Sequence, residues 1–243
     1  MRLAVISDIH GNLPALEAVL ADLERRRVTA VYHLGDLVGY NPFPNEVVAK
    51  VREMGLPGVV GNYDLAVAAA EEDPVGTYLN PVISPMALEI YRWTKSRVSE
   101  ENKSFLKSLP RQLHLQIKGQ GVLLTHGSPR DIREYLRPTL TEEDLAAALK
   151  DVEAQVVMVG HTHRPMVRRV GDKWLVNPGS VGFPKDGDRR AAYALVEWGE
   201  KFTVTIERVD YPVEETAQAL LAQGLPPQAA EDLRHGRRLK KPG

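Results

Sequence analysis

The stretch "LAVISDIH", residues 3–10, runs from a short apolar segment directly into polar side chains. An apolar run without polar alternation is typical of a strand that is buried on both faces. In open α/β sheets, ligands bind beyond the carboxyl ends of the strands. Asp8 and His10 stand at such an end, so this stretch predicts both a buried strand and a functional site.

Further short apolar runs stop at polar or glycine residues in the same way. Amphipathic helical patterns separate several of them, over 13–23, 47–54 and 140–149, and Thr141 with Asp144 forms a capping signal at the third. This alternation predicts an α/β fold, and the runs by themselves favour a largely parallel sheet. The further runs are AVYHL (30–34), GVV (58–60), GVLL (121–124), VVMV (156–159) and WLV (174–176).

The remaining segments are interpreted as parts of one domain over residues 1–243. Residues 65–118 have a mostly helical pattern and are expected to form an insertion that flanks the site. The apolar face of 76–98 predicts core packing, with a homo-oligomer contact as the alternative. Alternating residues 191–198 and 201–209 around Gly199 and Glu200 predict an antiparallel hairpin.

Composition limits the partners that this chain can have. Its 31 Lys and Arg residues balance 32 Asp and Glu residues, so no nucleic-acid partner is expected, and the basic segment 234–241 is interpreted as a solvated end. The absence of cysteine excludes disulfides, thiolate metal sites and thiol nucleophiles. No apolar stretch approaches the ~18 residues of a membrane span, so we expect a cytoplasmic protein without a membrane partner.

Seven polar side chains follow the predicted strands, and four of them are imidazoles. A set of oxygen and imidazole ligands without sulfur suits Mn²⁺, Fe, Co²⁺, Ni²⁺ or Zn²⁺, and seven ligands suit two ions better than one. Asp or Asn at a strand end is commonly only a turn residue, but turns do not need imidazoles. The seven are Asp8, His10, Asp36, Asn62, His126, His161 and His163.

Two cations that lie ~3.5–4 Å apart need an anion between them. Asp36 is the candidate for this bridge, because the preceding Gly35 lets the backbone approach closely on one side. Only two carboxylates then face two divalent cations, so the centre keeps the net positive charge that phosphate binding requires.

Five motifs in order, "SDIH", "GDLVGY", "GNYD", "THGSP" and "GHTH", resemble those of the calcineurin-like metallophosphoesterases. Within that superfamily, the sequence most resembles the small prokaryotic phosphodiesterase branch. The resemblance covers nearly the whole chain, since "NPGSVG" (177–182) and the C-terminal hairpin also follow the pattern of that branch. The resemblance implies an α/β fold arranged as a four-layer αββα sandwich with two mixed β-sheets.

The resemblance also implies roles for the seven ligands. Asp8, His10 and His163 would hold the first metal, and Asn62, His126 and His161 the second, with Asp36 as the bridge. A metal-bridging hydroxide would attack phosphorus in line with the leaving group. The implied activity is that of a dinuclear-metal phosphoesterase, preferentially a phosphodiesterase, that acts on a small phosphodiester or nucleotide-like substrate with two Mn²⁺ ions, or with Fe, Co, Ni or Zn.

Other functions remain open at this point. Within the enzyme class, the alternatives are a serine/threonine protein phosphatase and a dinucleoside polyphosphate hydrolase. Outside that class, the alternative is a non-catalytic interaction scaffold built on the same fold. A scaffold is expected to lose ligands first, whereas all seven positions are filled here.

Tyr63 departs from the family pattern. The third residue of the "GN-x-D" motif is a histidine in better-known members, where the following aspartate holds it and it assists the leaving group. A phenol with a pKa of ~10 is a poorer proton source at neutral pH than an imidazolium at ~6.5. We therefore assign Tyr63 and Asp64 as the catalytic pair and expect modest activity on esters with good leaving groups.

Three residues near the motifs are candidates for substrate binding. Asn12 opens the first predicted helix, so N-capping is an equal alternative to substrate contact. Arg130 follows His126 by four residues and could clamp a phosphate oxygen, although most arginines are solvated. Tyr40 follows the predicted bridge and could line the pocket.

Overall fold

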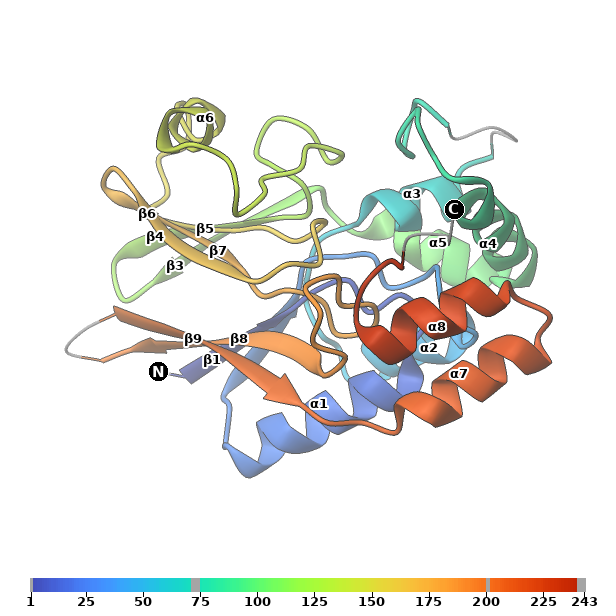
Figure 1. Cartoon of the computed structure of the whole chain (residues 1–243). Coiled ribbons are helices and arrows are strands. Elements are labelled where there is room, and N and C mark those ends of the chain that lie inside the picture. The colour runs from blue at the N-terminus through green and yellow to red at the C-terminus, as the bar shows by residue number, and fades with distance from the viewer. Residues whose placement is uncertain (1, 71–74, 200–201, 240–243) are drawn as a thin grey trace.

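The computed structural model describes residues 2–70, 75–199 and 202–239. Two β-sheets stack face to face, with helices on their outer sides (Figure 1). The four-stranded sheet has the order β2 (Ala30–His33), β1 (Arg2–Ile6), β8 (Ala191–Trp198), β9 (Phe202–Val209). The five-stranded sheet has the order β3 (Gln112–Ile117), β4 (Gln120–Thr125), β5 (Val156–Met158), β7 (Lys173–Asn177), β6 (Met166–Val170).

The helices form the outer layers of this sandwich. Helix α1 lies along the outer side of the four-stranded sheet, and α6 lies on the outer side of the five-stranded sheet (Figure 1). The other helices gather at one end of the two sheets. Their bounds are α1 Leu13–Arg25, α2 Pro44–Glu53, α3 Asn62–Ala68, α4 Pro85–Arg97, α5 Glu100–Ser108, α6 Glu142–Ala148, α7 Val213–Ala222 and α8 Pro227–His235.

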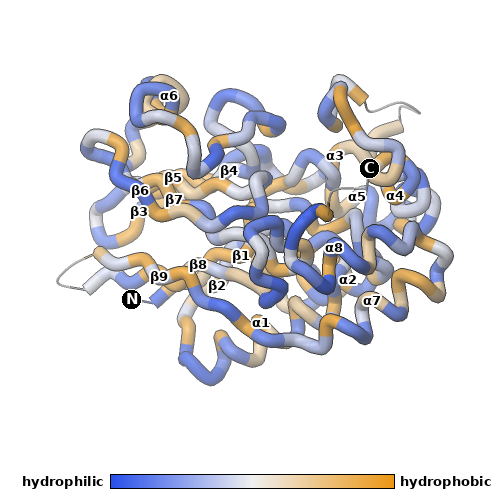
Figure 2. The backbone as a smooth tube through the Cα atoms, viewed as in Figure 1, coloured by the Kyte–Doolittle hydropathy of each residue, from blue (hydrophilic) through white to orange (hydrophobic). Residues whose placement is uncertain are grey.

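Strand β1 shows how the apolar runs build the layers. Side chains alternate along a strand, so Leu3 and Val5 enter the core between the two sheets, while Ala4 and Ile6 pack in the cluster that includes α1. All four are 0–1% exposed. The run is therefore buried on both faces, as its lack of polar alternation predicts, and Figure 2 shows hydrophobic residues along the stacked strands.

The prediction of an α/β sandwich with two mixed sheets is confirmed, but the largely parallel sheet is wrong. Three strand pairs are parallel and four are antiparallel. The difference arises from edge strands that tight turns join to their neighbours: β3 meets β4 through Lys118 and Gly119, and β6 meets β7 through Gly171. In addition, β8 returns beside β1 in the opposite direction.

Some of the predicted caps and strands are present in the structure, and one predicted strand is not. The capping box at Thr141 and Asp144 is present at the start of α6. Strands β8 and β9 pair antiparallel from Ala191 and Val209 onward, although the predicted turn residue Glu200 lies outside the described residues. The run GVV forms only an isolated bridge, between Gly58 and His33, instead of a strand, and the Val60 amide hydrogen-bonds to the Pro110 carbonyl of another segment.

Within 65–118, the described residues include most of α3, all of α4 and α5, and the first strand of the five-stranded sheet. In the predicted apolar face, Ile90 is fully buried, and Tyr78, Met86 and Trp93 pack partly buried against the same core cluster. The single-domain assignment and the homo-oligomer stay predictions. Among the described residues, no helix is both long and apolar enough to cross a membrane.

Candidate metal centre

Six of the seven predicted metal ligands lie where strands of the two sheets end. Asp8 and His10 follow β1, Asp36 follows β2, His126 follows β4, and His161 with His163 follows β5. Five of these six residues have φ between 48° and 65° in the left-handed region, where non-glycine residues are uncommon. Such conformations cost on the order of 1–3 kcal/mol each and cluster at functional sites. The strand ends are therefore bent sharply so that their side chains turn toward one point.

Close backbone packing between two glycines holds the Asp36 loop in place. Gly35 has a φ of +83°, and a Cβ atom there would lie 2.3 Å from the Gly61 amide nitrogen. A Cβ at Gly61 would in turn lie 2.1 Å from the Asp36 carboxylate. Only glycine fits both positions, so the loops that carry Asp36 and Asn62 pack directly against each other.

Asp8, His10 and His163 form the first group of potential ligands. The Nδ1 atoms of His10 and His163 donate to backbone carbonyls, at 2.9 Å from Val38 and 2.6 Å from Phe183, so their Nε2 atoms carry lone pairs. These Nε2 atoms face each other at 3.2 Å. Asp8 Oδ1 lies 3.3 Å from His163 Nε2 and has no hydrogen-bond partner among the described residues. Three lone pairs thus converge where a cation fits.

Asp36, His126 and His161 form the second group, with Asn62 beside it. His126 donates from Nδ1 to the Leu34 carbonyl at 2.7 Å, which leaves its Nε2 atom 3.0 Å from Asn62 Oδ1. His161 donates from Nε2 to the Arg133 carbonyl at 3.1 Å, so its Nδ1 atom carries the lone pair. Each histidine is therefore oriented by a backbone carbonyl, as metal-binding histidines usually are.

Asp36 lies between the two groups. Its Oδ2 atom is 3.5 Å from Nε2 of His10 in the first group and 3.4 Å from Nε2 of His126 in the second. Its Oδ1 atom accepts the Tyr63 amide at 2.8 Å, which fixes the orientation of the carboxylate. This is the position that a shared ligand would occupy.

The protonation of these groups suits metal binding. Burial, and then the neighbouring His126, lowers the pKa of His161 to about 3, and burial with nearby Lys185 lowers the pKa of His163 well below its ordinary value. Burial alone would lower the pKa of His126 too, but the Asp36 carboxylate outweighs it and raises that pKa to about 9. A metal would displace this proton on binding. The converging lone pairs, the carbonyl-oriented imidazoles and the sulfur-free donor set fit a pair of divalent cations.

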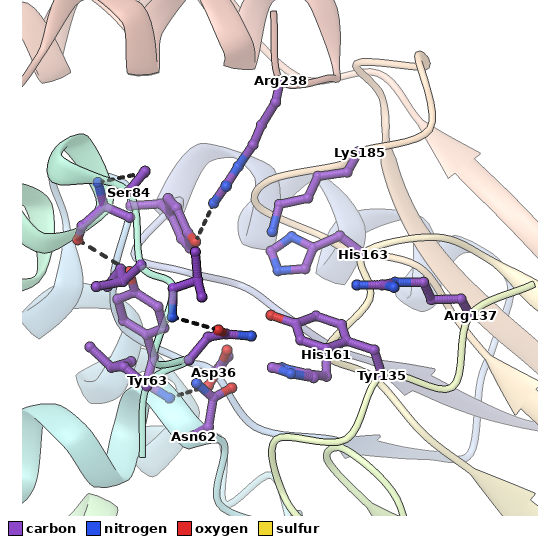
Figure 3. Close-up of a pocket in the computed structure, with 16 residues that line it drawn as sticks. Asp36, Asn62, Tyr63, Ser84, Tyr135, Arg137, His161, His163, Lys185 and Arg238 are labelled. Carbon is purple, nitrogen blue, oxygen red and sulfur yellow. Dashed lines mark hydrogen bonds between the residues drawn. The ribbon is translucent and has the colours of Figure 1, made fainter. Parts of the chain in front are cut away.

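A cavity of about 240 Å³ opens over this centre. Asp36, Asn62, His161 and His163 line its floor (Figure 3). One wall comes from the segment 79–87, whose lining side chains are mostly apolar but include Asn80 and Ser84, and the opposite wall carries basic side chains. The cationic wall consists of Arg137, Lys185 and Arg238, with Tyr135 below them.

The two residues predicted as catalytic take different positions. Tyr63 lines the cavity with its ring edge toward His10, and its hydroxyl donates to the Ala87 carbonyl at 3.4 Å. Burial raises the pKa of this phenol well above its ordinary value. Asp64 accepts the amides of Leu37, Val38 and Gly61 at 2.8–3.2 Å, so it braces the Asp36 loop. Their catalytic roles stay predictions.

Of the three predicted substrate-binding residues, only Tyr40 lines the cavity. Asn12 is fully buried and caps α1 by accepting the Ala15 amide at 3.2 Å, while its amide group donates to Gly182 and Tyr211. These contacts favour the capping alternative. Arg130 pairs with Glu134 and lines a separate cavity, so nothing directs it toward the metal centre.

Sequence reasoning missed the cations of the cavity wall. Arg238 belongs to the segment interpreted as a solvated end, but it reaches the cavity and donates to the Tyr40 hydroxyl at 3.1 Å. Lys240 and Lys241 of that segment lie outside the described residues. Lys185 stands three residues after the "NPGSVG" motif, and this proximity was the one signal available.

Known proteins match this chain along most of its length. The family model described as the calcineurin-like phosphoesterase superfamily domain matches residues 1–201. An uncharacterized protein of Methanocaldococcus jannaschii is 35% identical over 252 residues, which cover 97% of this chain and 98% of that protein. The phosphodiesterase YfcE of Escherichia coli is 26% identical over 210 residues, or 81% of this chain and 88% of YfcE. The crystal structure of a metallophosphoesterase from Sphaerobacter thermophilus has 34% identity and a TM-score of 0.80, covering 97% and 99% of the two chains.

Proposed function

Because the chain belongs to the calcineurin-like phosphoesterase superfamily, we propose that it is a phosphodiesterase that works with two divalent cations. The observation that carries the proposal is the place of Asp36, whose Oδ2 atom lies 3.4–3.5 Å from one imidazole of each ligand group. The similarity to a named phosphodiesterase at 26% identity supports the preference for diesters. The substrate that we propose is a small phosphodiester in the cytoplasm.

We assign the first cation to Asp8, His10 and His163, and the second to Asn62, His126 and His161, with Asp36 shared. Divalent cations bound there, Mn²⁺ first among them, would supply Lewis-acid activation of water and neutralise charge on the phosphoryl oxygens. The protein holds the ligands in fixed tautomers through the backbone carbonyls of Val38, Leu34, Phe183 and Arg133. Its cationic wall faces the negative charge of a phosphoester, and its apolar wall faces an ester group.

Metal removal tests the proposal directly. We expect chelated protein to be inactive and to regain activity with Mn²⁺, Co²⁺, Ni²⁺ or Zn²⁺ at a stoichiometry of two per chain. The measurement is hydrolysis of bis(p-nitrophenyl) phosphate and of p-nitrophenyl phosphate, with bound metal counted by mass spectrometry. A higher kcat/KM for the diester supports a phosphodiesterase. Two bound ions without turnover of either ester would instead support a non-catalytic scaffold.

Tyr63→His should raise the rate on diesters with poor leaving groups, because an imidazolium donates a proton at neutral pH more readily than a phenol. The expected gain is about 10-fold or more for an alkyl ester, and smaller for the p-nitrophenyl ester, which needs no proton. Tyr63→Phe is the matched control. Since the hydroxyl donates to the Ala87 carbonyl, and burial and the neighbouring Tyr40 raise its pKa well above the ordinary value, it is a weak proton donor, so we expect its removal to change either rate by less than about 3-fold. A Tyr63→His protein that is slower on every ester would contradict the assignment.

A further inference from the structure

A second cavity, of about 500 Å³, adjoins the cavity over the metal centre. Both are lined by the same five residues at their junction, so a ligand at the metal centre can extend from one into the other. The shared residues are Tyr40, Tyr135, Arg137, Lys185 and Arg238. None of the seven proposed metal ligands lines the second cavity.

The second cavity is strongly cationic. Its lining contains five basic side chains and a single carboxylate, and that carboxylate, Asp186, is paired with Arg208 outside the lining. Within the described ranges, none of the five cations lies within ion-pair distance of a carboxylate. The whole chain has a net charge of only −1, so this concentration is local. The five cations are Arg137, Arg164, Lys185, Arg237 and Arg238.

Aromatic residues hold three of these basic side chains in place. Burial, and then the neighbouring Arg238, lowers the pKa of Lys185 to about 7, so the arginines supply most of the positive charge. Lys185 Nζ lies 5.2 Å from the centre of the Tyr40 ring, and Arg238 donates to the hydroxyl of that tyrosine at 3.1 Å. Arg137 lies 4.9 Å from the centre of the Tyr135 ring. Such contacts orient a cation while leaving most of its hydrogen-bond donors free.

The same rings connect the cations to the metal ligands. Tyr135 stacks on His161 with 4.0 Å between ring centres, and Tyr40 meets His10 edge-on at 4.6 Å. The Lys185 amide also donates to the His163 carbonyl at 3.2 Å. The cationic cavity is therefore fixed relative to the metal centre, one aromatic side chain away from its ligands.

We propose that the cationic cavity binds a second phosphate of the substrate while the first lies at the metal centre. The preferred substrate is then a phosphodiester in which one esterified group carries a further phosphate. Unpaired Arg and Lys side chains at one cavity are the groups that bind phosphate through charge-assisted hydrogen bonds. This inference rests on the proposed phosphodiesterase function, and it names the substrate class for that site.

Two chromogenic diesters that differ by one phosphate test the inference. They are thymidine 5′-(p-nitrophenyl phosphate) and the same compound with a 3′-phosphate. We expect the wild-type protein to prefer the 3′-phosphorylated ester by about 10- to 100-fold in kcat/KM, the range that charge-assisted hydrogen bonds provide. The double variant Lys185→Gln/Arg238→Gln should reduce this ratio to nearly one. Arg92→Gln, which removes an exposed positive charge on α4, should leave the ratio unchanged.

Binding without turnover separates this inference from the proposed function. By calorimetry, thymidine 3′,5′-bisphosphate should bind at least about 10-fold more tightly than thymidine 5′-phosphate, and the double variant should lose the difference. This outcome would stand even if neither ester were hydrolysed. Equal affinities in the wild-type protein would overturn the inference, as would a preference that survives in the double variant. Inorganic phosphate is the third ligand: if it binds through Lys185 and Arg238 while the two nucleotides bind equally, the cavity holds free phosphate and the substrate assignment is wrong.

Discussion

Asp36→Asn will lower kcat/KM for a phosphodiester by about 10³-fold or more and reduce the bound metal from two ions per chain to one or none. Asp36 Oδ2 is the carboxylate oxygen that lies within 3.5 Å of a histidine Nε2 atom in both ligand groups. Removing one unit of charge about 4 Å from a cation costs about 4 kcal/mol at an effective dielectric constant of 20. That energy corresponds to about 10³-fold in rate.

The substitution is chosen so that the fold survives it. An asparagine oxygen can still accept the Tyr63 amide that Asp36 Oδ1 accepts at 2.8 Å, while the amide NH₂ turns toward the cations. Two measurements accompany the activity assay. Mass spectrometry counts the bound metal ions, and the melting temperature of chelated protein shows whether the fold is intact. Asp172→Asn, at a carboxylate whose side chain is 83% exposed, is the control. Two tightly bound ions and a rate within 10-fold of wild type would contradict the shared role of Asp36.

Gly182→Ala will lower the melting temperature by about 10 °C or more and weaken metal binding. A Cβ atom at Gly182 would lie 1.7 Å from the Ile9 carbonyl oxygen and 2.9 Å from Asn12 Cβ. The Ile9 atoms belong to the backbone, and a Cβ atom such as that of Asn12 cannot move without its own backbone, so the loop that carries Asp8 must shift. We expect Gly182→Ala to be among the exceptional substitutions that lower the free energy of unfolding by about 4–5 kcal/mol. For a chain of this size each kcal/mol lowers the melting temperature by about 2–4 °C, which gives the expected decrease.

The weakened metal binding follows from what this glycine contacts. Its amide donates to the Asp8 carbonyl at 3.0 Å, and its carbonyl accepts the side-chain amides of Asn12 and Asn41 at 3.0 and 3.1 Å. Gly121→Ala is the matched control, since its nearest contact would be the flexible end of Gln155 at 3.3 Å. Calorimetry of the two variants, each with and without Mn²⁺, provides the comparison. If both melt within about 2 °C of the wild type, the packing argument fails.

The sequence predicted the buried strands and the polar side chains that follow them because both are local signals, while the role of these side chains as metal ligands stays a prediction. The run 3–7 has no polar alternation, and its end at Asp8 and His10 is visible without any knowledge of the fold. The family resemblance, which the family model confirms over residues 1–201, added the pairing of distant motifs and the two mixed sheets.

Features that depend on chain segments meeting in space were not predictable in this way. Arg238 lies 75 residues beyond His163, and only the packing of α7 and α8 brings it to the cavity. The capping of α1 by Asn12 and the pairing of Arg130 with Glu134 are alternatives that sequence spacing leaves open, because each residue type serves in either role. The direction of β3 and β6 is a different case, because the glycines of their short turns, Gly119 and Gly171, are a local hairpin signal that the prediction of a largely parallel sheet did not take into account.

The ligand groups have one further consequence for the protein as a whole. Each group takes side chains from both sheets: Asp8 and His10 meet His163 across the interface, and Asp36 meets His126. Two ions seated there would cross-link the halves of the sandwich at one edge, much as a pair of disulfides would in a chain that has no cysteine. Metal binding would then be coupled to the stability of the fold, so the ions that prepare the protein for chemistry would also make it more resistant to heat and proteolysis.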